Sequence, residues 1–288
     1  MRREAMKVLI VGAGAVGLLL ACLLEEAGAA VQILAHQKQQ ARIINEQGII
    51  KDGHRHNVPA IADWAEIPAD AFVLLAVKYD ALDGLVPALK RYAPYNPVVF
   101  LQNGMLHLRL AEQLPHEDIA AASVEHGALK ISGNEVRHTG NGTVKWALLK
   151  GRQQKFLPFT KLEGFQSEWH EDADRLLFRK VLLNGIINPL TAITALKNGE
   201  LVTNPYAFEL MQRVYAELDR AFPEIKTLLP FEEVTALCKA TSENTSSMLM
   251  DRQAGRKMEL DTIVLYLLER SPIELPLLKA FYQLLKIN

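Results

Sequence analysis

Cysteine is scarce in this chain, with two residues among 288. Cys22 and Cys238 lie outside any CxxC motif and outside any cluster with metal-ligand spacing. Two isolated cysteines cannot build a disulfide framework, and their spacing indicates no metal site. We therefore expect reduced thiols, a cytoplasmic location and no metal.

The chain also has no large excess of basic or of acidic residues. The chain has 32 Lys and Arg residues against 33 Asp and Glu residues, so its formal net charge is -1. No global field favours a nucleic acid or an anionic membrane as partner, and an anionic ligand has to be met by local groups. With 49% hydrophobic residues, a chain of this length can bury a substantial core, and we expect two domains.

Only one uncharged stretch comes close to the length of a membrane span. Residues 8–24 fall slightly short of the roughly 18 to 20 residues that a bilayer requires, and three of them are glycines. The basic residues ahead of this stretch and the sequence LLAC at 19–22 resemble a lipoprotein export signal. The alternative interpretation is a strand, a glycine turn and a helix.

The glycine spacing favours the second interpretation. KVLIV at 7–11 predicts a buried strand, residues 18–26 a helix that stops at Gly28, and residues 29–35 a second strand. In the GxGxxG motif, the first glycine permits a tight turn, the second lets a diphosphate approach the backbone, and the third lets helix and strand pack closely. This β-α-β unit predicts a dinucleotide site with contacts from Gly12, Ala13, Gly14, Ala15, Val16 and Gly17.

The end of the second strand indicates which dinucleotide is bound. NAD enzymes usually place an acid there for the ribose 2′-OH, whereas NADP enzymes place a base for the 2′-phosphate. Here His36, Lys38 and Arg42 follow the strand, and no acid precedes Glu46. NADP(H) is favoured, with His36, Lys38 and Arg42 as candidate contacts, although Lys38 and Arg42 can also be a solvated helix face.

Further strands and helices alternate in the first half. Residues 71–77 and 97–102 are apolar strand-like runs with a helical pattern between them, which predicts a doubly wound, Rossmann-type parallel sheet. Ligands bind beyond the carboxyl ends of such strands, where Lys78 and Asn103 lie, and either residue can instead be a plain turn residue. Residues 121–149 predict hairpin strands, and we interpret His126 and His138 in this region as structural.

From residue 172 on, the sequence has helical periodicity and no obvious strand. The chain is therefore expected to divide into a cofactor domain at 1–170 and an all-α substrate domain at 171–288. In its first helix, Lys180, Asn184 and Asn188 recur every four residues and share one stripe, which faces a cleft or solvent. Pro189 predicts a kink in this helix or its end.

The segment from 243 to 261 carries a second polar cluster. Ser246 and Ser247 are good helix-capping residues. Glu259 precedes the last long helical pattern, at a helix start where an acid is favoured electrostatically. On the residues alone, helix capping by the serines and a favourable charge at the helix start for Glu259 are favoured over a functional role.

Together these motifs resemble the ketopantoate reductase (2-dehydropantoate 2-reductase) family. The matching segments occur in order over nearly the whole chain. They are GAGAVG at 12–17, Lys78, QNGM at 102–105, KVLLNGIINPLTA at 180–192, KNGEL at 197–201, and ENTSSML with GRKMELD between 243 and 261.

The resemblance implies NADPH-dependent reduction of ketopantoate to pantoate, a step toward pantothenate and coenzyme A. It implies that Lys180 is the general acid and that Glu259 binds a substrate hydroxyl and helps to position Lys180. It also places Lys78 and Asn103 at the junction of cofactor and substrate. The substrate contacts that it implies are Asn103, Asn184, Asn188, Asn198 and Ser247.

Three positions depart from the family pattern. His36 replaces a common Arg, which bears on the strictness of NADPH use, and Met250 and Met258 replace a common Gln and Thr. Two alternatives stay open: a reductase for another branched 2-oxo acid, and a non-catalytic NADP(H) sensor. The sequence leaves the oligomeric state open, with a homodimer as one possibility.

Overall fold

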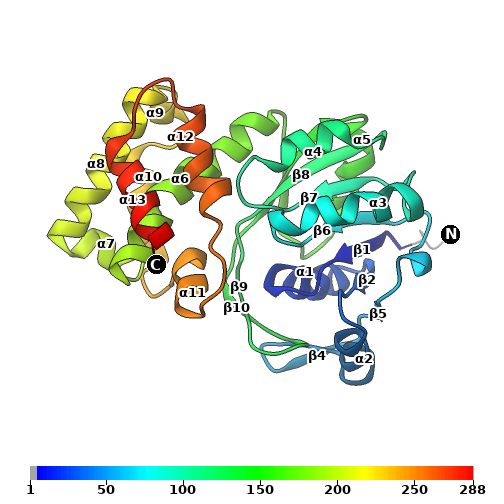
Figure 1. Ribbon diagram of the computed structural model, residues 1–288. Coiled ribbons are helices and arrows are strands. Elements are labelled where there is room, and N and C mark those ends of the chain that lie inside the picture. The colour runs from blue at the N-terminus through cyan, green and yellow to red at the C-terminus, as the bar shows by residue number, and fades with distance from the viewer. Residues whose placement is uncertain (1–4, 288) are drawn as a thin grey trace. The chain divides into compact units, whose positions relative to one another are not determined.

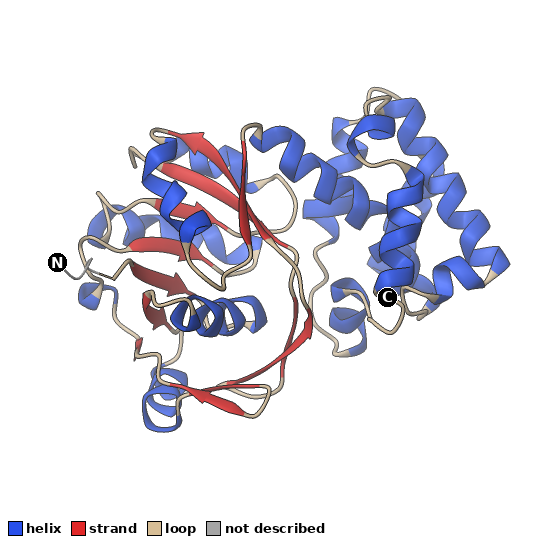
Figure 2. Ribbon diagram, turned by 180° about the vertical axis from the view of Figure 1, so that it is seen from behind, coloured by secondary structure: helices blue, strands red, loops and turns tan. Residues whose placement is uncertain are grey.

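The computed structural model describes residues 5–287, which divide into two compact units. The first unit comprises residues up to 102 together with 107–176, and the second comprises 103–106 with 177 onward. Each unit has its own kind of architecture, a sheet with helices in the first and helices alone in the second (Figures 1 and 2). The fold class expected from the sequence is confirmed.

An eight-stranded sheet forms the centre of the first unit, in the order β12-β11-β8-β7-β6-β1-β2-β5. All neighbouring pairs are parallel except β8 and β11. The predicted parallel sheet is therefore present, with one antiparallel pair near its edge. The strands are β1 (Lys7–Val11), β2 (Ala30–Leu34), β5 (Ala60–Ile61), β6 (Phe72–Leu75), β7 (Val98–Phe100), β8 (Ile119–Val124), β11 (Val144–Lys150) and β12 (Ser167–His170).

Both faces of this sheet are buried, because side chains alternate between two apolar clusters. Val8 and Ile10 of β1 join the cluster under α1, whereas Leu9 and Val11 join the one under α3. The helices and short turns of this unit are α1 (Ala15–Glu26), α2 (Lys38–Gln47), η1 (Trp64–Glu66), η2 (Tyr79–Ala81), α3 (Leu82–Tyr92), α4 (His107–Gln113), α5 (Gln153–Phe156) and η3 (Leu157–Lys161). The stretch at 8–24 is thus β1, the glycine turn and most of α1, as the nucleotide-fold interpretation predicts.

A second, four-stranded sheet was not expected from the sequence. It has the order β4-β3-β10-β9 and joins β3 (Ile49–Lys51) and β4 (His54–His56) to β9 (Gly127–Lys130) and β10 (Glu135–Gly140). Its strands β3, β9 and β10 pack along α1 (Figure 1). The strands predicted within 121–149 are present, but β8 and β11 belong to the large sheet and only β9 and β10 form a hairpin in the small one.

The second unit is helical, and its described part from residue 177 contains no strand. It begins within α6 (Ala173–Thr194). The remaining helices are α7 (Glu200–Thr203), α8 (Pro205–Ala221), α9 (Ile225–Leu228), α10 (Phe231–Ala240), α11 (Ser247–Gln253), the π-helical turn η4 (Asp261–Leu265), α12 (Tyr266–Arg270) and α13 (Pro276–Ile287).

Helix α6 corrects two expectations. It is long and apolar enough to count as a candidate membrane span beside residues 8–24, but 72% of its apolar window is buried inside the protein, as in the core helix of a globular protein. It also continues past Pro189 to Thr194, so of the two alternatives predicted for Pro189, a kink or the end of the helix, the end is excluded. Leu190 and Ala192 beyond the proline are fully buried, and their packing offsets the one lost backbone hydrogen bond.

Candidate active site

The glycine turn between β1 and α1 leaves one side of the backbone open. Gly12 has a φ of +111°, and a Cβ there would lie 2.9 Å from the Ala76 carbonyl oxygen. A Cβ on Gly17 would lie 2.0 Å from the Gly12 oxygen. At Gly14, by contrast, the nearest protein atom would be 4.0 Å away. Packing therefore requires glycine at 12 and 17, whereas the space beside Gly14 fits a diphosphate that approaches the backbone.

The N-terminus of α1 meets the same space. Gly14 is its N-cap, no side chain caps it, and its first turn, which includes Ala15 and Val16, has no acidic residue. Uncapped N–H groups and the helix dipole favour an anion at this position. The turn thus has the geometry that the phosphates of a dinucleotide need.

The predicted adenosine-side residues lie at the end of β2. His36 and Lys38 are exposed, and Lys38 is the first residue of α2. Arg42 is exposed and pairs with Glu46 of the same helix at 3.4 Å, as a residue on a solvated helix face can. Two side chains that the sequence analysis did not single out, Gln40 and Lys130, bond to the carbonyl oxygen of Ala13.

Lys78 lies just beyond β6, as predicted, and is exposed at the start of η2. The buried Gln102 at the end of β7 supports this edge, because its amide nitrogen donates to the carbonyl oxygens of Leu75 (2.7 Å) and Val77 (2.9 Å). The ends of the two central strands are therefore held together beside Lys78.

The chain then passes directly from Gln102 into a segment that belongs to the second unit. There the Asn103 Nδ2 atom donates to Glu259 Oε2 at 2.9 Å. Gly104 has a φ of +85°, and a Cβ there would lie 2.2 Å from the Thr262 carbonyl oxygen. Arg270 stacks on Phe178 at 3.9 Å and donates to the sulfur of Met105 at 3.8 Å. The segment 103–106 is thus bound against η4 and α12, with Asn103 on the predicted catalytic carboxylate.

The stripe on α6 is not a solvent-exposed face. Lys180 and Asn184 are half-buried, and Asn188 is 6% exposed. Gly185, between the two asparagines, is packed so closely that a Cβ would lie 2.4 Å from a methyl carbon of Leu267. Glu259 is half-buried on the segment that leads into η4 and α12, the helix that carries Leu267.

The two serines of the ENTSSML motif have different environments. Ser246 is buried, caps α11 by accepting from the Leu249 amide at 3.1 Å, and shares a 2.7 Å hydrogen bond with Thr191 of α6. Ser247, in the first turn of α11, is exposed. The capping interpretation therefore holds for Ser246, while Ser247 keeps a hydroxyl that a ligand can reach.

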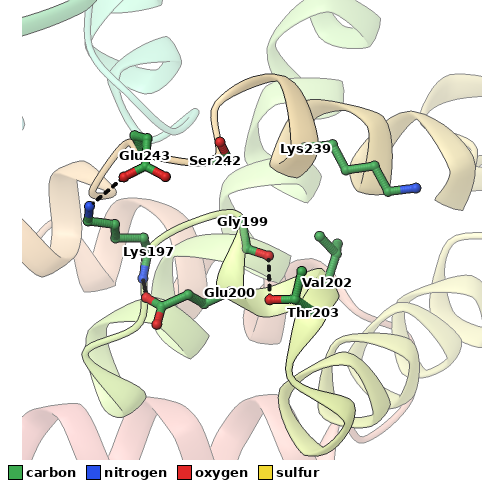
Figure 3. A pocket seen from close by; sticks show the side chains of 8 residues that line it. All are labelled: Lys197, Gly199, Glu200, Val202, Thr203, Lys239, Ser242 and Glu243. Atoms are coloured by element: carbon green, nitrogen blue, oxygen red, sulfur yellow. Dashed lines mark hydrogen bonds and ion pairs between the residues drawn. The ribbon is translucent and has the colours of Figure 1, made fainter.

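Asn198 fixes the loop that leads to these serines. Its side-chain nitrogen donates to Thr241 Oγ1 at 3.0 Å, its backbone N–H donates to the Asn244 carbonyl at 3.0 Å, and its buried side-chain oxygen has no hydrogen-bond partner among the described residues. Beside it lies a cavity of about 500 Å³, shown in Figure 3, where Lys197 meets Glu243 at 2.7 Å. None of the predicted substrate contacts on α6 lines this cavity.

Other titratable groups of the first unit lack the geometry of a metal or nucleophile site. His126 Nδ1 and His138 Nε2 lie 3.0 Å apart. The pKa of His126 is lowered to about 4, mainly by burial and to a smaller extent by the neighbouring His138. Burial also raises the pKa of the Cys22 thiol to about 12. Within residues 5–287 there is no group of three or more His, Cys, Asp or Glu side chains that could hold a metal ion.

Comparison with known proteins matches both halves of the chain to family models. Residues 8–151 match the ketopantoate reductase PanE/ApbA family, and residues 172–288 match its C-terminal domain. A protein named 2-dehydropantoate 2-reductase from Listeria innocua is 32% identical, over 96% of this chain and 95% of that protein. One of the same name from Bacillus subtilis is 34% identical, over 93% of this chain and 92% of the relative.

Solved structures give the same result for the fold. A structure titled as the probable 2-dehydropantoate 2-reductase of Bacillus subtilis superposes with a TM-score of 0.84 at 33% identity, covering 98% of this chain and 99% of its own. D-mandelate dehydrogenase with NADH and anilino(oxo)acetate has the same fold, with a TM-score of 0.84 at 21% identity and 98% coverage of each chain. The chain belongs to the ketopantoate reductase PanE/ApbA family.

Proposed function

We propose that this chain reduces ketopantoate to pantoate with NADPH, using the cofactor domain at 1–170 and the substrate domain at 171–288. The observation that carries the proposal is the hydrogen bond between Asn103 and Glu259. It joins the residue that follows the nucleotide-binding sheet to the carboxylate that the family uses for substrate. A protein that only senses NADP(H) has no need of this pairing, nor of a lysine on the α6 stripe.

The glycine turn and the N-terminus of α1 fit the diphosphate of NADPH, because the space beside Gly14 is open and the first turn of α1 is uncapped. When bound, NADPH supplies the hydride. Lys78 and Asn103, next to the ends of β6 and β7, are proposed to contact the cofactor near the substrate. Ala13, Ala15 and Val16 complete the backbone surface of the turn.

Lys180 is proposed as the general acid. Addition of hydride to a carbonyl carbon creates an alkoxide, and an ammonium group both stabilises the developing charge and donates the proton that neutralises it. Glu259 is proposed to accept a hydrogen bond from the substrate hydroxyl and to position Lys180. Asn103 holds this carboxylate from the side of the 103–106 segment.

The substrate carboxylate and hydroxyl need several donors. Asn184 and Asn188 on the α6 stripe and the exposed hydroxyl of Ser247 are proposed to provide them. Asn198 is proposed to act mainly by holding the loop before Ser246, because its hydrogen bonds to Thr241 and Asn244 go to that loop. We further propose that the enzyme works in the cytoplasm, in the synthesis of pantothenate.

The test is NADPH oxidation followed by absorbance with ketopantoate and, separately, with 2-oxoisovalerate, which lacks the hydroxymethyl group. We expect a preference for ketopantoate of at least about 10²-fold in kcat/KM, since a site built to bond a hydroxyl rejects the analogue without it. The Glu259→Gln variant should lose most of this preference. Equal rates with both acids would identify a general reductase of branched 2-oxo acids, and tight NADPH binding without turnover would identify a sensor.

A further inference from the structure

An ammonium group touches the glycine turn from the small sheet. Lys130, the last residue of β9, places its Nζ atom 2.8 Å from the carbonyl oxygen of Ala13, the residue between the first two glycines of the motif. Gln40 of α2 donates to the same oxygen at 3.0 Å and to the Gly133 carbonyl at 2.6 Å. The hairpin, the turn and the start of α2 therefore meet at one carbonyl group.

Lys130 is an exposed residue, but the hairpin that carries it is fixed by the fold. Asn134, in the turn of the β9–β10 hairpin, is buried and donates to the Gly48 carbonyl at the end of α2 at 2.8 Å. With the bond from Gln40 near the start of α2, the hairpin is attached to that helix at both ends. Lys130 is thereby held beside the turn before any ligand arrives.

The charge of Lys130 is poorly compensated within the described chain. Several other lysines, such as Lys7 and Lys51, pair with carboxylates at 2.7 and 2.6 Å. Lys130 has only a neutral carbonyl as partner among residues 5–287, and burial lowers its pKa from the ordinary lysine value. A cation that is partly removed from water without an anionic partner gains more from a bound anion than a fully solvated one does.

The surroundings favour one anion of the cofactor in particular. The ribose of the adenosine half is expected at the end of β2, and α2, which carries Gln40, begins two residues after His36. The diphosphate is already expected to bind at the N-terminus of α1. His36 offers an imidazole where the family commonly has arginine, and an imidazole is a weaker partner for a phosphate because it is charged only when protonated.

We propose that Lys130 binds the 2′-phosphate of NADPH. It supplies the positive charge that the common arginine, replaced here by His36, provides in other members of the family. This inference rests on the proposed NADPH-dependent function, but it concerns binding alone. The specificity for NADPH over NADH then comes from a residue of β9, which is far in sequence from the end of β2. On binding, the ammonium exchanges the Ala13 carbonyl for a charge-assisted bond to phosphate oxygen.

The experiment measures dissociation constants by calorimetry for adenosine 2′,5′-bisphosphate and for 5′-AMP, which differ only in the 2′-phosphate. In the Lys130→Met variant we expect the bisphosphate to bind about tenfold more weakly or worse, with 5′-AMP and NADH unchanged. Lys130→Arg should retain most of the affinity. Lys90→Met is the matched control, because Lys90 is exposed in the last turn of α3, which packs on the opposite face of the large sheet.

Equal weakening of the bisphosphate and 5′-AMP would overturn the proposal, since it would place Lys130 on the 5′-phosphate or in the support of the turn. Unchanged affinity for both would overturn it as well, and so would a wild-type protein that does not distinguish the two fragments. All of these results are independent of turnover. A chain that binds the bisphosphate through Lys130 but fails to reduce ketopantoate would contradict the proposed function and leave this inference standing.

Discussion

Substitution of Gly104 by alanine should damage the candidate active site without touching its functional groups. The new Cβ would lie 2.2 Å from the Thr262 carbonyl oxygen, so the segment 103–106 has to move away from η4 by about 1 Å to reach ordinary contact. Asn103, the adjacent residue, then loses its 2.9 Å hydrogen bond to Glu259. We expect kcat/KM for ketopantoate to fall by roughly 10²-fold, the typical effect of an error of about 1 Å in a catalytic group.

The backbone cost of the substitution can be separated from the clash. Gly164 has a φ of +80°, close to the +85° of Gly104, but a Cβ on Gly164 would meet no atom within 4 Å. Both alanine variants therefore pay about 1 kcal/mol for the left-handed conformation. Gly104→Ala should lose a further 1–3 kcal/mol, roughly, from overpacking.

The assay combines steady-state kinetics with urea unfolding of the two variants and of the wild-type protein. NADPH affinity, measured separately by fluorescence, should fall much less than kcat/KM, since the displaced Asn103 is only one of the proposed cofactor contacts and the glycine turn belongs to the first unit. If Gly104→Ala is as active as Gly164→Ala, the placement of Asn103 on Glu259 is not needed for catalysis. The hydrogen bond between Asn103 and Glu259 would then have no part in the active site.

Three other predictions test separate parts of the structure. Burial lowers the pKa of His107 to about 4, so between pH 6.5 and 4 the unfolded chain takes up a proton at this residue while the folded one does not. The free energy of unfolding therefore falls as the pH falls through this range, and the His107→Phe variant should show a smaller fall. Unfolding at several pH values measures the effect, at most ~3 kcal/mol at the acid end, and an unchanged slope would exclude it. Gly17→Ala should weaken NADPH binding by more than about tenfold, because its Cβ would lie 2.0 Å from the Gly12 oxygen, and normal affinity would contradict the geometry of the turn. Ser246→Ala should cost about 1–2 kcal/mol through the lost helix cap and the lost bond to α6, whereas the exposed Ser247→Ala should change the free energy of unfolding by less than about 0.5 kcal/mol; equal effects would show that the cap does not stabilise α11.

Much of the large sheet could be predicted because its signals are local. The apolar runs that became β1, β6 and β7, and the glycines at the start of α1, lie within short windows of sequence. The small sheet could not be predicted in this way. Its strands β3 and β4 have three residues each, and β3 pairs with β10, more than 80 positions away. Short polar strands such as HRH at 54–56 acquire their structure only from such distant partners.

The candidate site shows the same division. Periodicity placed Lys180, Asn184 and Asn188 on one face of α6, since spacing along a helix is a local property. It could not show that Asn103 leaves the first unit to bond Glu259, 156 residues later, or that Lys130 reaches Ala13 across 117 positions. It also gave no means to distinguish Ser246 from Ser247, because the cap depends on the backbone angles at the start of α11.

Replacement of Lys180 is the decisive experiment for the mechanism. In the Lys180→Ala variant, kcat for NADPH-dependent reduction of ketopantoate should fall by about 10²-fold or more, while the dissociation constant for NADPH stays close to the wild-type value. This pair of results would assign to Lys180 a role in the chemical step. A near-normal kcat would remove Lys180 from proton transfer and contradict the proposed mechanism.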